Sequence, residues 1–345
     1  MTRAMMPDRR RFLSAAVAAP LAGLAASAFS PAARAAAPEF LFKYGNNLPL
    51  THPLNVRAQE AANQIRDASK GRMEIRIFPN NQLGGDTDML AQVRSGGIEM
   101  FTPSALVVST LAPAAAINAV GFAFNDYTQV WKAMDGQLGA YVRAAMAKAG
   151  LVSFEKMWDN GFRETTTSNR PINNAADMRG LKIRVPVSPL SIDMFKGLGA
   201  APASLQFSEV YSSLQTHIVD AQENPLPIVQ VAKLYEVQKY CSLTHHIWDG
   251  FWFVLNPRAW QRLPKDLQAI ASDAFNQAAL KQRDDVSKLN EAAVTELQAK
   301  GLTINRPAPD TFRAALRQAN FYAQYKEKFG NETWSLLESY TGKLV

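Results

Sequence analysis

Three polar clusters lie between Phe162 and Pro225, and each contains a side chain that can bind an anion. The clusters read FRETTTSNRPI, GLKIRVP and FSEVYSSLQTHIVDAQENP. The first two supply the guanidinium groups of Arg163 and Arg184, and the third supplies the amide of Asn224. A planar guanidinium offers donors in a fixed fork that matches a carboxylate. No nucleophile, base and orienting group occur together here, so we predict a site that holds a small anionic molecule without transforming it.

The catalytic motifs that would indicate an enzyme are absent from the sequence. It contains no G-x-S-x-G elbow, H-E-x-x-H, P-loop or Gly-rich dinucleotide fingerprint. The four histidines lie outside the core of the arginine cluster, which leaves no obvious general base beside it. His245 and His246 are adjacent, and adjacent strand residues point to opposite faces, so they cannot form an i, i+4 metal pair. We therefore predict no enzymatic activity, no metal and no cofactor.

Several segments in series resemble one family, the DctP-type solute-binding proteins of tripartite ATP-independent periplasmic (TRAP) transporters. They are GLKIRVP, FSEVYSSLQT and VDAQENP, with supporting matches in FKYGNN, IFPNNQLGGDTDML and YEVQKYCSLTHHIWDGFWFVLN. The resemblance covers most of the chain after about Phe40. It implies that Arg184 forms a salt bridge with a ligand carboxylate, and that Arg163 and Asn224 support it. An alternative is that Arg163 is a hinge residue that bridges Glu164 or Asp159, and that Asn224 only closes a turn.

Five further side chains are candidates for the same site. Asn47 and Asp86 lie at a strand end and a helix start, and strand ends in open α/β sheets face the ligand crevice. By resemblance both loops face the ligand, where Asp86 would bond a hydroxyl or amine, although it could instead be only a helix N-cap. Ser104 is a similar loop candidate, and Phe207 resembles the aromatic residue that packs over the ligand. Trp158 would add aromatic surface near the crevice or hinge. The alternative is that it belongs to the apolar core.

The order of elements predicts the α/β fold class. Alternating strands and helices are expected at 40–44, 52–69, 73–78, 86–94 and 98–101. A second series is expected to have strands at 163–167, 181–185 and 202–205, and helices that begin at 189 and 208. This β-α-β order argues for open, mostly parallel sheets with helices on both faces. We therefore expect two α/β domains around a central cleft, the two-lobed architecture of periplasmic binding proteins.

One helical pattern, Pro264–Lys300, is too long for a single small domain. At 1.5 Å per residue it would extend about 55 Å, so it must kink or cross between domains. The resemblance favours a helix that braces both lobes. It also sets the domain boundaries, with domain I at 36–161 plus 251–289 and domain II, which carries the arginines, at 162–250 plus 290–345. Three chain crossings would limit the motion to bending open and shut.

Residues 1–35 read as an export signal. Arg9-Arg10-Arg11-Phe12-Leu13 resembles the twin-arginine pattern, an apolar run follows from Ala15 to Phe29, and Ala33-Arg34-Ala35 fits a small-residue cleavage site. The apolar run is shorter than the roughly 20 residues of a membrane anchor. Asp8 departs from the pattern, which leaves the general secretory route open. We expect cleavage near Ala35/Ala36 and a soluble, unanchored periplasmic protein.

Charge and cysteine content narrow the possible partners. Removal of residues 1–35 takes away five arginines and one aspartate, which lowers the formal charge from +7 to +3. Nothing resembles the clustered Lys/Arg face of a nucleic-acid binder. Cys241 is the only cysteine. We expect it to be a buried structural thiol, although an odd cysteine in an exported protein could also be reactive or form an intermolecular bridge.

Taken together, these features predict a monomeric exported receptor for an organic acid, which it hands to the integral membrane subunits of a TRAP transporter. Two lobes would close around the ligand, and the ion pair with Arg184 would strengthen as water is excluded. A receptor that presents its ligand to a sensor kinase is an alternative that the sequence leaves open. An exported α/β enzyme that acts on carboxylates is a weaker one. The aromatic content slightly favours an aromatic or hydrophobic acid over a sugar acid.

Overall fold

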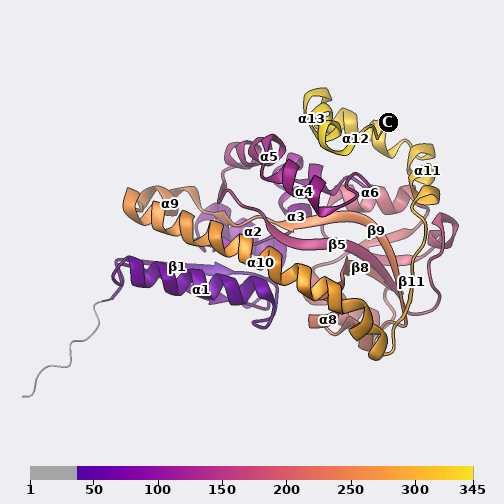
Figure 1. Cartoon of the computed structure of the whole chain (residues 1–345), viewed down its shortest axis with the longest axis horizontal. Helices are drawn as coiled ribbons and strands as arrows, with labels where there is room; N and C mark the ends of the chain where they lie inside the picture. Colours follow the sequence, from indigo (N-terminus) through magenta and orange to yellow (C-terminus); the bar gives the residue numbers. More distant parts are fainter. Residues whose placement is uncertain (1–36, 345) are drawn as a thin grey trace, which may run out of the picture. The chain divides into compact units, whose positions relative to one another are not determined.

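The computed structural model describes residues 37–344, so the predicted export signal lies outside the described residues. Its framework is two β-sheets, each covered by helices (Figure 1). The first sheet has five strands in the order β2-β1-β3-β10-β4. These strands are β1 (Phe40–Gly45), β2 (Met73–Phe78), β3 (Met100–Phe101), β4 (Val152–Ser153) and β10 (Val254–Leu255).

The second sheet has six strands in the order β11-β9-β5-β8-β6-β7. They are β5 (Trp158–Thr167), β6 (Lys182–Val185), β7 (Ala201–Ser204), β8 (Ala221–Pro225), β9 (Tyr240–Phe251) and β11 (Thr303–Asn305). β5 pairs antiparallel with both β8 and β9, whereas β6 pairs parallel with β7 and β8. β11 also pairs parallel with β9. The expectation of mostly parallel sheets therefore holds only in part, because both sheets contain parallel and antiparallel pairs.

The predicted elements of both series are present. The helices of the first part of the chain are α1 (Pro53–Ala68), α2 (Asp86–Ser95), α3 (Ala105–Val108), η1 (Pro113–Ala119), α4 (Tyr127–Met134) and α5 (Gln137–Lys148). Those associated with the second sheet are η2 (Ala175–Met178), α6 (Pro189–Gly197), η3 (Phe207–Glu209), α7 (Val210–Gln215), α8 (Leu226–Val231) and η4 (Leu234–Glu236). The chain ends with α9 (Pro257–Arg262), α10 (Lys265–Ala299), α11 (Asp310–Gln318), α12 (Phe321–Phe329) and α13 (Asn331–Thr341).

The predicted long helix is confirmed as α10, a single helix of 35 residues. It lies along α1 at one end and reaches α8 and β11 at the other (Figure 1). Phe275 and its neighbours join the apolar cluster of the five-stranded sheet, whereas Ala293 and Leu297 join a cluster beside β9. An ion pair from Arg57 of α1 to Asp285, with Nε and Oδ2 2.6 Å apart, adds to the contact. The helix therefore belongs to the cores of both halves.

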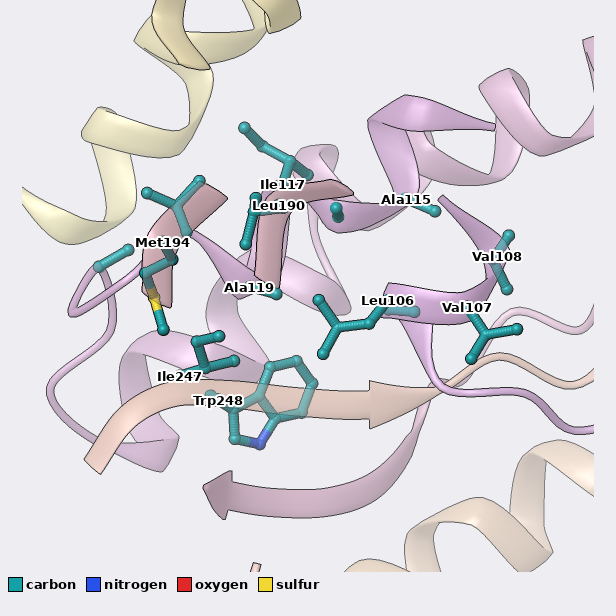
Figure 2. Packing of buried hydrophobic residues seen from close by; sticks show 14 of the residues in the cluster. Leu106, Val107, Val108, Ala115, Ile117, Ala119, Leu190, Met194, Ile247 and Trp248 are labelled. Atoms are coloured by element: carbon teal, nitrogen blue, oxygen red, sulfur yellow. The ribbon is translucent and has the colours of Figure 1, made fainter. Parts of the chain in front are cut away.

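The largest apolar cluster joins elements of both sheets. Figure 2 shows Ile247 and Trp248 of β9 beneath side chains from α3, η1 and α6. The indole Nε1 of Trp248 donates to Oδ1 of Asp159 on β5, at 3.0 Å. Cys241 is fully buried on β9, which confirms the prediction of a buried thiol, and burial raises its pKa. Within residues 37–344, no helix is long and apolar enough to cross a membrane.

Gln282 fastens α10 to β5 through the backbone of Asp159. Its Oε1 accepts from the Asp159 amide at 2.9 Å, and its Nε2 donates to the Asp159 carbonyl at 2.7 Å. The side chain is fully buried, so water cannot replace these bonds. Gln282 thus takes the place of a neighbouring strand at the start of β5.

Gln282→Leu should destabilise the protein strongly. Leucine keeps the volume but leaves a buried N–H and a buried C=O without partners, each worth about 1–3 kcal/mol. We expect the free energy of unfolding in urea to fall by about 2–5 kcal/mol. Gln277→Leu, at an exposed position of the same helix, is the control and should change little. Equal stability of the two variants would show that α10 is not fastened at Gln282.

Candidate binding site

A cavity of about 30 Å³ lies between elements of the two sheets. Seven of the eight predicted site residues line it, namely Asn47, Asp86, Ser104, Arg163, Arg184, Phe207 and Asn224. The remaining lining residues are Leu48, Val107, Asn160, Pro186, Ile228 and Phe251. The volume suffices for about two water molecules. A small organic acid would fit only if the lining residues moved apart.

Arg184 is a buried cation with unused donors. It lies on β6, 2% exposed, and its Nε and Nη2 donate to the carbonyl oxygen of Leu205 at 3.0 and 2.7 Å. Its Nη1 bonds to no residue of the described chain, and no carboxylate there lies within salt-bridge distance. Burial, together with the nearby charge of Arg163, lowers the pKa of Arg184 to about 10, so it stays protonated at neutral pH. Such a group favours an anionic partner.

Arg163, in contrast, is already paired with two carboxylates. Its Nη2 donates to Oε1 of Glu223 at 2.9 Å and to the Glu223 carbonyl at 2.6 Å, and its Nε bonds to Oε2 of the same residue. Its Nη1 donates to Oδ2 of Asp249 at 2.9 Å. The alternative partners expected from sequence are wrong, because Glu164 instead contacts His245, with Oε1 and Nδ1 2.7 Å apart, and Asp159 accepts from a tryptophan.

The pKa values of Glu223 and Asp249 are shifted in opposite directions. Burial alone raises the pKa of Glu223, but Arg163 and His246 outweigh it and bring the pKa to about 2. Nε2 of His246 lies 3.0 Å from Oε2 of Glu223. For Asp249, burial outweighs the contributions of Arg163, Ser104 and Asn160, and its pKa is raised. The charge of Arg163 is thus neutralised mainly by Glu223.

A second part of the cavity wall, formed by Asn47, Asp86 and Ser104, offers amide, carboxylate and hydroxyl groups. Nδ2 of Asn47 donates to Oδ1 of Asp86 at 2.9 Å. Burial raises the pKa of Asp86, against the opposing influence of Arg184, Asn47 and the backbone amide of Phe207. Oγ of Ser104 donates to the two carboxylate oxygens of Asp249 at 2.9 and 2.7 Å. This wall therefore offers chiefly hydrogen-bond acceptors.

The last predicted residues have distinct places. The Phe207 ring lies near Arg184, with its centroid 5.9 Å from Cζ, which is within cation–π range. Nδ2 of Asn224 donates to Oε1 of Gln222 at 2.6 Å, which holds the amide against the cavity. Trp158 is not among the lining residues. It is fully buried in the apolar core, with its ring centroid 5.6 Å from that of Phe253, so the structure favours the core alternative.

Sequence reasoning missed several residues that shape the site. Asn160 lines the cavity, and its Nδ2 donates to Oδ2 of Asp249 at 2.9 Å. Both residues directly precede a glycine, Gly161 and Gly250, inside long strands. For Asp249 the available signal was one acidic residue in the apolar run IWDGFWF, whereas Asn160 lay before the expected start of its strand at residue 163.

Gln206 connects the two walls directly. Its Oε1 accepts from the backbone N–H of Asp86 at 3.0 Å, and its Nε2 donates to Oγ1 of Thr87. The helix α2 begins after Gly85, which has no side chain to cap it. A Cβ at Gly85 would lie 3.2 Å from Cδ of Gln206, so glycine permits this close approach. Gln206 therefore supplies a helix cap from the opposite half of the molecule.

The sequence and the fold are both similar to those of known proteins. Residues 44–328 match the pattern of bacterial extracellular solute-binding protein family 7. The 2,3-diketo-L-gulonate-binding periplasmic protein of Escherichia coli K12 is 32% identical, over 82% of this chain and 85% of that protein.

Two solved structures of TRAP periplasmic solute-binding proteins show the likeness of fold. One, from Polaromonas sp. JS666 with bound D-erythronate, has a TM-score of 0.84 and 29% identity, covering 88% of this chain and 100% of that one. The other, from Sulfurospirillum deleyianum with bound succinate, has a TM-score of 0.82 and 27% identity, covering 88% and 99%.

Gln206→Ala should shift the molecule towards a more open arrangement. Two hydrogen bonds between the walls are lost, with a net contribution of roughly 1–3 kcal/mol. Small-angle scattering without added ligand should give a larger radius of gyration than for the parent. Gln215→Ala, at an exposed position of the nearby helix α7, serves as the control. If both variants scatter like the parent, Gln206 does not hold the walls together.

Proposed function

Because the chain belongs to family 7 of the bacterial extracellular solute-binding proteins, we propose that its cavity captures an organic acid through Arg184. The protein is a solute-binding protein of the TRAP type, a class of transport receptors, and not an enzyme. Its structural neighbours have the same two-lobed α/β architecture. Our proposal concerns which residues bind the acid and how the lobes respond.

The unpaired donors of Arg184 are the observation that carries the proposal. Of the two arginines at the cavity, Arg163 is already neutralised by Glu223, whereas Arg184 meets no carboxylate within residues 37–344. A ligand carboxylate would accept from Nη1 and Nη2, while Leu205 holds the guanidinium from behind. Arg163 and Asn224 would assist by lining the same cavity. This division of roles follows from charge balance.

Binding proceeds, in this proposal, from an open form that closes over the acid. The small volume of the cavity supports this order, because a bound acid must enter before the walls meet. Closure would form the hydrogen bonds of Gln206 to α2 and would place the Phe207 ring near Arg184. Water leaves as the lobes close, and the lower effective dielectric strengthens the ion pair. The ligand thus favours the closed form by its extra contacts there.

We further propose that the closed, loaded protein acts as a monomer in the periplasm and delivers the acid to integral membrane subunits of a TRAP transporter. The twin-arginine-like start of the sequence supports export, and the E. coli relative is a periplasmic protein by name. The proposed domain boundaries, near residues 161, 250 and 290, would form the hinge. α10 packs against elements on both sides of them.

Arg184→Lys should weaken binding of the organic acid about ten- to a hundredfold. Lysine keeps the charge but loses the planar fork, and one charge-assisted hydrogen bond contributes roughly 1.5–3 kcal/mol. A thermal-shift screen of organic acids identifies a ligand, and calorimetric titration then measures the variants. Arg179→Lys, an exposed position before the same strand, is the control. If Arg184→Lys binds the acid within about twofold of the parent, Arg184 does not anchor the carboxylate.

Export and delivery are tested in cells of the source organism. The mature protein should appear in the soluble periplasmic extract, and its N-terminal sequence should begin at Ala36. Deletion of its gene should abolish uptake of the identified acid, because the membrane subunits then lack a loaded receptor. Recovery with washed membranes and an uncleaved signal would contradict the proposed location. Normal uptake after deletion would instead favour a sensory role.

A further inference from the structure

Two buried amide oxygens at the cavity lack hydrogen-bond partners. They are Oδ1 of Asn47 and Oδ1 of Asn160, and neither bonds to any residue in the described part of the chain. Both side chains line the cavity. Buried polar atoms without partners are rare, and each such atom calls for an explanation. A donor group of a bound molecule would supply the missing bond.

The orientation of both amides is fixed by neighbouring carboxylates. Nδ2 of Asn160 donates to Asp249, and Nδ2 of Asn47 donates to Asp86, each at 2.9 Å. Turning either amide around would place its oxygen against a carboxylate oxygen, which cannot donate. Asp249 is certain to act as an acceptor because it also receives a bond from Nη1 of Arg163. The two free oxygens are therefore acceptors that the fold holds in place.

The residues of this wall disfavour a second carboxylate on the ligand. Asp86 lies there, and its carboxylate can accept further donors. Oγ of Ser104 already donates to Asp249, so it too can only accept. No lysine or arginine other than Arg163 and Arg184 lines the cavity among the residues described. A second carboxylate at this wall would meet like charge and unpaired acceptors.

We infer that the ligand carries a single carboxylate and at least two hydrogen-bond donors, which the cavity-lining amides of Asn47 and Asn160 recognise. This inference rests on the proposed function and narrows its substrate class. It reverses the slight preference for an aromatic or hydrophobic acid drawn from composition. Asn160 becomes a specificity-determining residue, because an acid without donors leaves its oxygen unpaired. Sites built to bond a polar group discriminate strongly against analogues that lack it.

Matched acids test the inference on the full mature protein. Calorimetric titration compares D-erythronate with butanoate, 4-aminobutanoate and succinate, and D-galactonate with hexanoate, 6-aminohexanoate and adipate. We expect the hydroxylated acid of one chain length to bind at least about 100-fold more tightly than its deoxy analogue and its dicarboxylate. Tightest binding of 4-aminobutanoate or 6-aminohexanoate would identify the donor as an amine, and would still support recognition by the acceptor atoms of Asn47 and Asn160.

Three alanine variants separate recognition from stability. Asn160→Ala and Asn47→Ala should each reduce the ratio of affinities between hydroxylated and deoxy acid by about tenfold or more, through loss of binding by the hydroxylated acid only. Asn118→Ala is the matched control, because its buried Oδ1 also lacks a partner but its side chain does not line the cavity. Its affinity ratio should stay that of the parent, whatever its stability.

The outcomes distinguish this inference from the function on which it rests. Equal binding of hydroxylated and deoxy acids, or tightest binding of a dicarboxylate, overturns the inference and leaves an organic-acid receptor standing. An unchanged ratio in both Asn160→Ala and Asn47→Ala also overturns it, because water would then satisfy the two oxygens. If no acid in a wider library binds, the proposed function fails and the inference falls with it.

Discussion

The pairing of Arg163 with Glu223 and Asp249 is the constraint on which the site depends. A buried guanidinium is tolerated only when its charge is matched and its donors are bonded. The three residues come from β5, β8 and β9, neighbouring strands of the six-stranded sheet. Their ion pairs therefore fix how those strands face the cavity. Asp249 also holds Ser104 and Asn160 by hydrogen bonds, so the same cluster positions part of the recognition wall.

One short segment between β7 and α7 links anchoring to closure. The carbonyl of Leu205 holds Arg184, the side chain of Gln206 caps α2 across the cavity, and the ring of Phe207 lies near the arginine. These three roles fall on consecutive residues. Any movement of the segment that opens the cavity therefore also changes the surroundings of the cation. In the proposed mechanism, this arrangement would couple charge capture to lobe movement without a separate relay.

Local patterns predicted the helices and the anchor strand well, because these features depend on neighbours in sequence. The periodicity of Pro264–Lys300 predicted α10, and the strand expected at 181–185 is β6, which carries Arg184. The partners of Arg163 were not predictable in the same way, since Glu223 and Asp249 lie 60 and 86 positions away. The strand expected to begin at residue 163 in fact begins at Trp158 and contains Gly161. The φ of +123° at Gly161 sits within β5 beside Pro225, where a bulge and not a turn is required.

The continuous helix α10 gives the molecule a mechanical property. Its residues up to Ala279 pack in the apolar core of the five-stranded sheet. Its residues from Ala293 onward pack in the apolar cluster beside β9. The stretch between them covers about 21 Å of helix. Gln282 within this stretch is also bonded to β5, so in the proposed closure a relative rotation of the two halves would be spread over gradual curvature of the helix and not concentrated at one bond. A helix that is continuous through both cores would therefore resist twisting of one half against the other.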